Sequence, residues 1–87
     1  MRHITDRELV SWPILADEVK DESSHQRHKW GVQSRTPAEW MMYLTEEIGE
    51  LAEAISECEY RGAPPADVHK EAIQVATLAL KIAEMYR

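Results

Sequence analysis

The chain has few of the features that anchor a protein in a membrane or cross-link it covalently. Among its 87 residues Cys58 is the only cysteine, which excludes an intramolecular disulfide framework and favours a reducing compartment. No apolar run approaches the roughly 20 residues that cross a bilayer, and the charged N-terminus lacks the apolar core of a signal peptide. We therefore expect a single soluble domain over residues 1–87, located in the cytoplasm.

Strand patterns, internal repeats and low-complexity segments are also missing. The apolar residues instead recur at the three- and four-residue spacing of helices, and proline, glycine, serine and threonine separate these stretches. The predicted fold class is all-α.

Two helices have clear boundaries in the sequence. Residues 36–39 (TPAE) combine a capping threonine, a proline suited to the first helical position and a glutamate that completes a capping box. The helix that begins there is predicted to run to about Tyr60. Residues 61–67 (RGAPPAD) end it, because the glycine suits a left-handed cap and the prolines prevent continuation. The next helix is predicted to begin near Pro65 and to reach the C-terminus.

The first third of the chain is less regular. We predict a turn or short helix near Asp6–Ser11 and a longer helix over about Pro13–Lys29, since proline interrupts any helix around it. A loop over residues 29–37 follows. Two long helices and one broken helix cannot enclose a core on both sides, so the helical hairpin and the N-terminal helix are expected to complete a four-helix bundle by homo-oligomerisation.

Basic residues are absent where acidic residues are most frequent. Residues 36–60 contain seven glutamates and no lysine or arginine. An ordinary solvated helix pairs Glu with Lys three or four residues away. The net charge of −6 also argues against a nucleic-acid polymer as partner, because the phosphate backbone needs a basic surface. Something other than this helix must therefore neutralise its glutamates.

A helical wheel separates the glutamates that are predicted to lie at the core from those in solvent. Leu44, Ile48, Leu51 and Ile55 form the predicted apolar face of the second helix. Glu47 lies at the edge of that face, and Glu50 is one turn further on. In the third helix Glu71 falls within a wide apolar arc, with Gln74 at its edge. If the two helices are antiparallel neighbours, these oxygen ligands converge and suit Mg²⁺, with Mn²⁺ as a substitute.

These residues resemble a known family. Glu46-Glu47-Ile48-Gly49-Glu50 matches the EExxE motif of the MazG-like nucleotide pyrophosphohydrolases, within the all-α NTP pyrophosphatase superfamily. Residues 71–74 stand where that family has its second motif, ExxD, and residues 28–40 (HKWGVQSRTPAEW) resemble the KWG…W segment of its small, single-domain phage and cassette members. The chain departs from the pattern at Gln74, which replaces the aspartate.

The resemblance implies a Mg²⁺-dependent hydrolase that cleaves a nucleoside triphosphate, expected to be a deoxynucleotide, to the monophosphate and pyrophosphate. Its role would be removal of non-canonical or excess nucleotides, and it would act as a homodimer or a dimer of dimers. The implied metal ligands are Glu47, Glu50, Glu71 and Gln74. The implied catalytic residues are Glu46, Glu47 and Glu50. The candidate substrate-binding residues are Gln26, Lys29, Trp30, Gln33 and Arg35.

Two alternatives stay open from the sequence. Another pyrophosphate compound, such as phosphoribosyl-ATP, can be the substrate. The chain can also be a non-catalytic, antitoxin-like helical module whose glutamates meet a basic protein surface. Glu71 separates these classes, because a docking surface has no use for a carboxylate inside an apolar arc.

Overall fold

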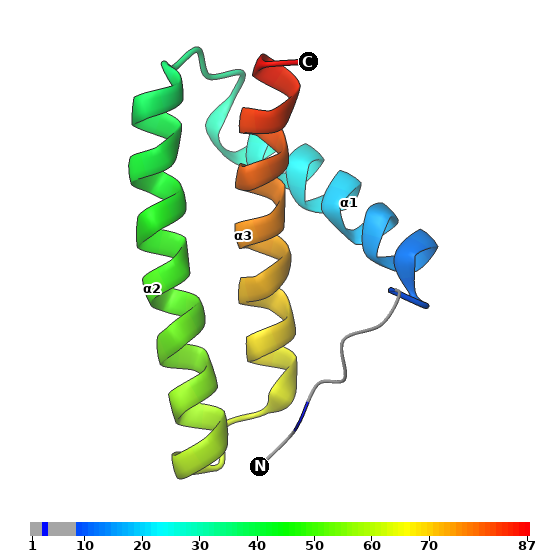
Figure 1. Cartoon of the computed structure of the whole chain (residues 1–87), viewed down its shortest axis with the longest axis vertical. Coiled ribbons are helices and arrows are strands. Elements are labelled where there is room, and N and C mark those ends of the chain that lie inside the picture. Colours follow the sequence, from blue (N-terminus) through cyan, green and yellow to red (C-terminus); the bar gives the residue numbers. More distant parts are fainter. Residues whose placement is uncertain (1–2, 4–8) are drawn as a thin grey trace.

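The computed structural model describes residue 3 and residues 9–87, which contain three helices and no strand (Figure 1). They are α1 (Trp12–Trp30), α2 (Pro37–Arg61) and α3 (Pro65–Met85). The all-α prediction is confirmed for this part of the chain. Of the turn or short helix predicted near Asp6–Ser11, residues 6–8 lie outside the described residues, and residues 10–11 form a turn in which the Leu9 carbonyl accepts from the backbone N–H of Trp12.

Local sequence signals define the α2–α3 hairpin as predicted. Thr36 accepts a hydrogen bond from the backbone N–H of Glu39, and the Glu39 side chain accepts one from the backbone N–H of Thr36, so the capping box is formed. Gly62 ends α2 in the left-handed conformation, with φ 73°, where a residue with a β-carbon is strained. Only Ala63 and Pro64 separate this glycine from Pro65, where α3 begins. The short connection makes α2 and α3 antiparallel neighbours.

Helix α1 extends one residue beyond its predicted range at each end. Pro13 occupies its first turn, where a missing backbone N–H leaves no hydrogen bond unmade. The helix ends at Gly31, which has φ 76° and donates its backbone N–H to the carbonyl of Arg27. Pro13 therefore starts this helix and does not interrupt it.

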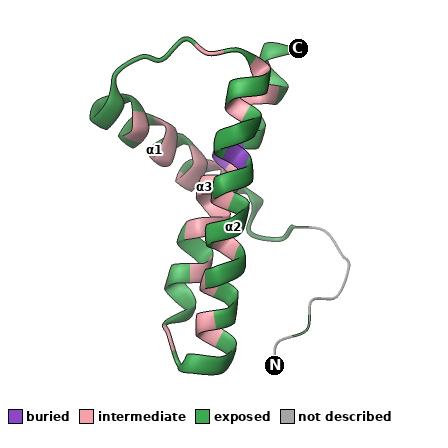
Figure 2. Ribbon diagram, turned by 90° about the vertical axis from the view of Figure 1, so that its left-hand side faces the viewer, coloured by how far each residue is buried: buried purple, intermediate pink, exposed green. Residues whose placement is uncertain are grey.

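Helix α3 is the centre of the molecule. It packs along α2 and also against α1, whereas no Cα atoms of α1 and α2 lie within 8 Å of each other. The buried residues lie on α2 and α3: Leu44, Leu78 and Thr77, whose hydroxyl group donates to the carbonyl of Ile73 (Figure 2). Contact with two helices explains why α3 has a wider apolar arc than α2.

The predicted apolar face of α2 is only partly covered. Leu44 is buried and Leu51 half-buried, but Ile48 is 46% exposed and Ile55 45% exposed. The predicted apolar face is therefore buried only in part within one chain, in line with the expectation that these helices cannot enclose a core on both sides. The physical reason is that α3 covers one side of this apolar face of α2, and no other described helix covers the adjacent side. None of the described helices is both long enough and apolar enough to span a membrane.

Candidate functional site

Three glutamates converge between α2 and α3. Glu47 and Glu50 lie one turn apart on α2, and Glu71 faces them from the first half of α3. One carboxylate oxygen from each residue lies within 4.8 Å of the others. We call these three residues the carboxylate cluster. Antiparallel packing of the hairpin creates it, because it places the first turns of α3 opposite the middle of α2.

The cluster holds negative charge that the protein compensates poorly. The pKa of Glu47 is raised from 4.5 to about 7, first by burial and then by the charge of Glu50 and a side-chain hydrogen bond with it. The charge of Glu71 raises this pKa further. Burial and two neighbouring carboxylates thus make ionisation of Glu47 costly, and a bound cation would lower that cost.

Gln74 bridges two members of the cluster. With its amide nitrogen towards them, it donates to Glu71 Oε2 at 2.8 Å and to Glu47 Oε2 at 3.1 Å. An amide oxygen in that place would face only acceptors, so the hydrogen-bond network decides the orientation. Gln74 thus acts here as a donor that moderates repulsion between carboxylates. To serve as a metal ligand, its amide must turn so that the oxygen faces the cluster.

A cleft of about 690 Å³ opens beside the cluster, where the end of α1, the α1–α2 loop, the start of α2 and the end of α3 meet (Figure 1). Glu47 and Gln74 line it, which connects it to the cluster. All five candidate substrate-binding residues also line it: Gln26, Lys29, Trp30, Gln33 and Arg35. Its volume lies within the range of about 300–1,000 Å³ that is usual for small-molecule sites.

Aromatic rings and cations alternate along the cleft. The Lys29 ammonium group lies 4.8 Å from the centroid of the Trp30 ring, and the Arg35 guanidinium lies 4.9 Å from that of Tyr43. Trp40 and Tyr43 meet edge to face, with centroids 6.2 Å apart. Trp30 is 62% exposed, so it is a rim residue and does not fill the end of the bundle.

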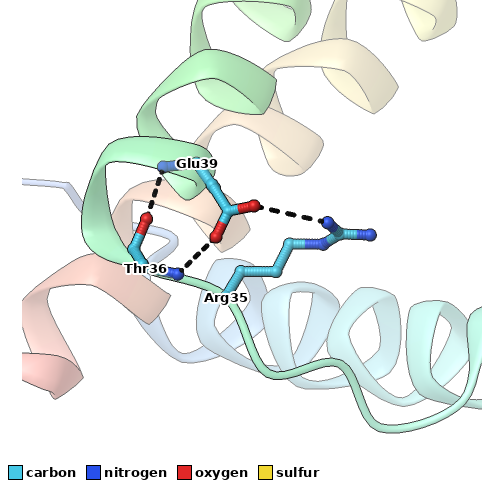
Figure 3. A network of polar contacts seen from close by, with 3 residues as sticks. All are labelled: Arg35, Thr36 and Glu39. Carbon is cyan, nitrogen blue, oxygen red and sulfur yellow. Dashed lines mark hydrogen bonds and ion pairs between the residues drawn. The ribbon is translucent and has the colours of Figure 1, made fainter.

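Arg35 is held by the start of α2. Its guanidinium lies 4.0 Å from Glu39, the same carboxylate that completes the capping box with Thr36 (Figure 3). The hydrogen bond to the Thr36 backbone is the largest cause of the lowered pKa of Glu39. Within the described residues, Arg35 Nε is buried without a hydrogen-bond partner. The capping signal that begins the helix therefore also positions one cation of the cleft.

Lys81 lines the same cleft, although it was not among the residues predicted for the site. Its ammonium group donates to Gln26 Oε1 and lies 5.1 Å from the centroid of the Trp40 ring. Burial lowers the pKa of Lys81, and the charge of Arg27 adds to this effect while Glu22 opposes it. A signal was present in the sequence: Lys81 follows Gln74 by seven residues, which places both on one face of α3.

The remaining predicted residue lies outside this arrangement. Glu46 is exposed on α2 and is not a member of the carboxylate cluster. Its predicted catalytic role stays a prediction. Glu50 and Glu71 line a second, acidic depression of about 460 Å³ between α2 and α3, so the cluster lies between the two hollows.

Comparisons with protein-family models, curated proteins and solved structures return no match. The resemblance to MazG-like pyrophosphohydrolases thus stays a prediction that rests on the motifs themselves. The geometry described above rests on this chain's own residues and is independent of it.

Proposed function

We propose that the protein is a Mg²⁺-dependent nucleotide pyrophosphohydrolase that converts a deoxynucleoside triphosphate to the monophosphate and pyrophosphate. The observation that carries the proposal is the convergence of Glu47, Glu50 and Glu71 beside a cleft lined by cations and aromatic rings. A site for a metal-bound polyanion needs these two environments next to each other. The role that we propose is removal of non-canonical or excess nucleotides.

The donor set of the cluster fits a hard divalent cation. Carboxylate oxygens are the ligands that Mg²⁺ and Mn²⁺ prefer, and the cluster contains no thiolate or imidazole of the kind zinc favours. The raised pKa of Glu47 supports the same conclusion, because it reports negative charge without a nearby positive partner. Glu47, Glu50 and Glu71 would hold the ion, and Gln74 would join them after its amide turns.

When bound, Mg²⁺ would neutralise the phosphates and polarise the phosphorus under attack. The water oxygen forms a bond to the α-phosphorus, and the bond from that phosphorus to the bridging oxygen breaks. Pyrophosphate leaves with the electron pair, and the water loses a proton. A carboxylate oxygen that is not a ligand would orient this water and accept its proton, and Glu46 and Glu47 are the candidates.

The cleft offers groups for the rest of a nucleotide. Trp30 lines the cleft and is 62% exposed, so a base can stack on its ring, and Lys29 and Arg35 can supply positive charge to the phosphates. Gln33 can hydrogen-bond a base edge, because its amide carries both a donor and an acceptor.

Product analysis tests the proposal directly. The protein is incubated with each deoxynucleoside triphosphate and Mg²⁺, and the products are separated by ion-exchange chromatography. We expect equal amounts of monophosphate and pyrophosphate, and no product when the metal is chelated. Release of single phosphate would refute the proposed bond cleavage. Hydrolysis of phosphoribosyl-ATP alone would support the alternative substrate, and no reaction with any of them would support a non-catalytic module.

We also propose that α2 completes a four-helix bundle with a second copy of the chain, as a homodimer or a dimer of dimers. Met41, Ile48 and Ile55 are exposed by 50, 46 and 45% and repeat every seven residues, as in a helix–helix seam. Sedimentation equilibrium should give at least twice the chain mass of 10.1 kDa. Ile48→Glu should lower that mass, and a monomeric wild-type protein would refute the proposal.

A further inference from the structure

One face of α3 runs from the carboxylate cluster into the cleft. Gln74, Leu78 and Lys81 share this face and all line the cleft. Seven residues of α-helix separate the first from the last, which is about 10 Å along the helix axis. A phosphate chain that is bound through metal at the cluster can therefore extend along α3 towards Lys81.

The ammonium group of Lys81 is held by a short polar chain. Its Nζ donates to Gln26 Oε1, while Gln26 Nε2 donates to Glu22 Oε2 at 2.8 Å. Both polar atoms of the Gln26 side chain are thus engaged, and its amide orientation is set. Because a lysine carries three N–H donors, one bond to Gln26 leaves donors available for a ligand.

The charge of Lys81 has no direct ion-pair partner among the described residues. The ion pairs found there involve other cations, namely Arg35, Arg61, His69 and Arg87. The Lys81 ammonium is half-buried, lies over the Trp40 ring and is near the charge of Arg27. A cation in such a place destabilises the free protein, and an anionic ligand would relieve that cost.

We propose that Lys81 binds the polyphosphate chain of the substrate, and that Gln26 is the positioning residue that directs its ammonium group into the cleft. This inference rests on the proposed function, since it assigns a role within the same site. Gln26, which the sequence suggested as a substrate-binding residue, then acts on the substrate only through Lys81. The other interpretation is that Lys81 only ties α1 to α3 through Gln26.

Binding of inorganic tripolyphosphate in the presence of Mg²⁺ separates these interpretations without requiring catalysis. Calorimetry would compare the wild type with Lys81→Met, Lys81→Arg and the control Lys20→Met, which removes an exposed lysine of α1 that lines neither hollow. Methionine keeps an unbranched apolar side chain of similar length and removes the charge. We expect Lys81→Met to weaken binding by about 10- to 100-fold, the usual worth of a charge-assisted hydrogen bond. Arginine should retain most of the affinity, and Lys20→Met all of it.

Kinetics with the nucleotide panel adds a second readout. Lys81→Met should raise KM for every deoxynucleotide by a similar factor and change kcat less. Gln26→Leu should also raise KM uniformly, because the phosphate chain is common to all bases. A change in base preference with Gln26→Leu would overturn its positioning role.

Several outcomes overturn the Lys81 inference alone. One is unchanged tripolyphosphate affinity in a Lys81→Met protein that melts cooperatively, and another is a wild type that hydrolyses nucleotides but binds no tripolyphosphate. If Lys81→Met does not fold, the Lys81 side-chain NMR signal of the wild type decides: a shift on adding tripolyphosphate, absent for Lys20, supports the inference. Tripolyphosphate binding that needs Lys81, without hydrolysis of any nucleotide, would refute the proposed reaction and keep the anion site.

Discussion

The two halves of the site, the carboxylate cluster and the cleft, differ in how their charges are balanced. In the carboxylate cluster, acids lie within 4.8 Å of one another, and the amide of Gln74 is the neutral group between two of them. Along the cleft, three cations have neighbours that accommodate them: the Trp30 ring for Lys29, Tyr43 and Glu39 for Arg35, and Gln26 for Lys81.

This difference indicates what each half lacks. The cluster would gain most from a cation that the chain does not provide, because burial and like charge both raise the pKa of Glu47. Four Lys and Arg side chains and three glutamates line the cleft, and Lys81 has no ion-pair partner among the described residues, so this cation can accept an anion. The metal-bound polyphosphate of the proposed function would supply both at once. The following changes test this comparison, from the largest expected effect to the smallest.

Neutralising the cluster should have the largest effect. Glu50→Gln preserves shape but removes one proposed ligand, and we expect kcat/KM to fall by at least about 100-fold, since even groups around a metal ligand are worth about 10–100-fold. Mg²⁺ affinity measured by calorimetry should fall with it. The control is Glu59→Gln, an exposed glutamate of α2 that lines neither hollow. Equal activity of both variants would contradict the proposed role of the cluster.

Converting Gln74 to aspartate should increase the uncompensated negative charge of the carboxylate cluster. Gln74→Asp removes the donor that bridges Glu47 and Glu71 and adds a fourth carboxylate, so we expect the metal-free protein to lose about 2 kcal/mol of stability. Mg²⁺ should restore most of this loss, because a cation then replaces the lost donor. Thermal melts with and without MgCl₂ measure both effects. Ser34→Asp, on the α1–α2 loop, serves as the control, and a loss that Mg²⁺ cannot reverse would argue against metal at the cluster.

The raised pKa of Glu47 predicts a pH-dependent difference in stability. Above about pH 7 the carboxylate is ionised in the folded and the unfolded chain, and its repulsion in the fold remains. As the pH falls from 7 towards 4.5, the folded protein takes up a proton first, so it gains stability relative to the unfolded chain. Without metal, Glu47→Gln should therefore be about 1.5 kcal/mol more stable than wild type at pH 8, after allowance for solvent screening, and about equal at pH 4.5. Denaturant titrations at both pH values test this, and equal stability at pH 8 would contradict the charge repulsion inferred here.

Removal of the capping box should have the smallest effect, and it should affect the cleft and not the carboxylate cluster. Thr36→Ala removes the side-chain acceptor at the start of α2 and should cost about 1 kcal/mol. Mg²⁺ affinity should not change, because the cluster lies further along the helix. Thr45→Ala is the matched control, since that hydroxyl group donates to a carbonyl in the helix and caps nothing. A change in Mg²⁺ affinity with Thr36→Ala would show that the two halves are not separable.

The helix boundaries could be predicted because their causes are local. The capping box at Thr36 and the left-handed glycine at Gly62 act over three or four residues, and both are confirmed. Pairing of Glu47 with Glu50 follows in the same way from one turn of helix. Exposure of Ile48 was not predictable from the periodicity of α2, because periodicity marks an apolar face without saying what covers it.

The sequence by itself determined three helical segments and an acidic stretch without basic partners. Only the tertiary structure decided that Glu71 meets Glu47 and Glu50, that Gln74 bridges them through its amide nitrogen, and that Lys81 joins the cleft. The reason is that helix propensity and capping are set by near neighbours, whereas these contacts depend on how α3 packs against α2 and α1 at once.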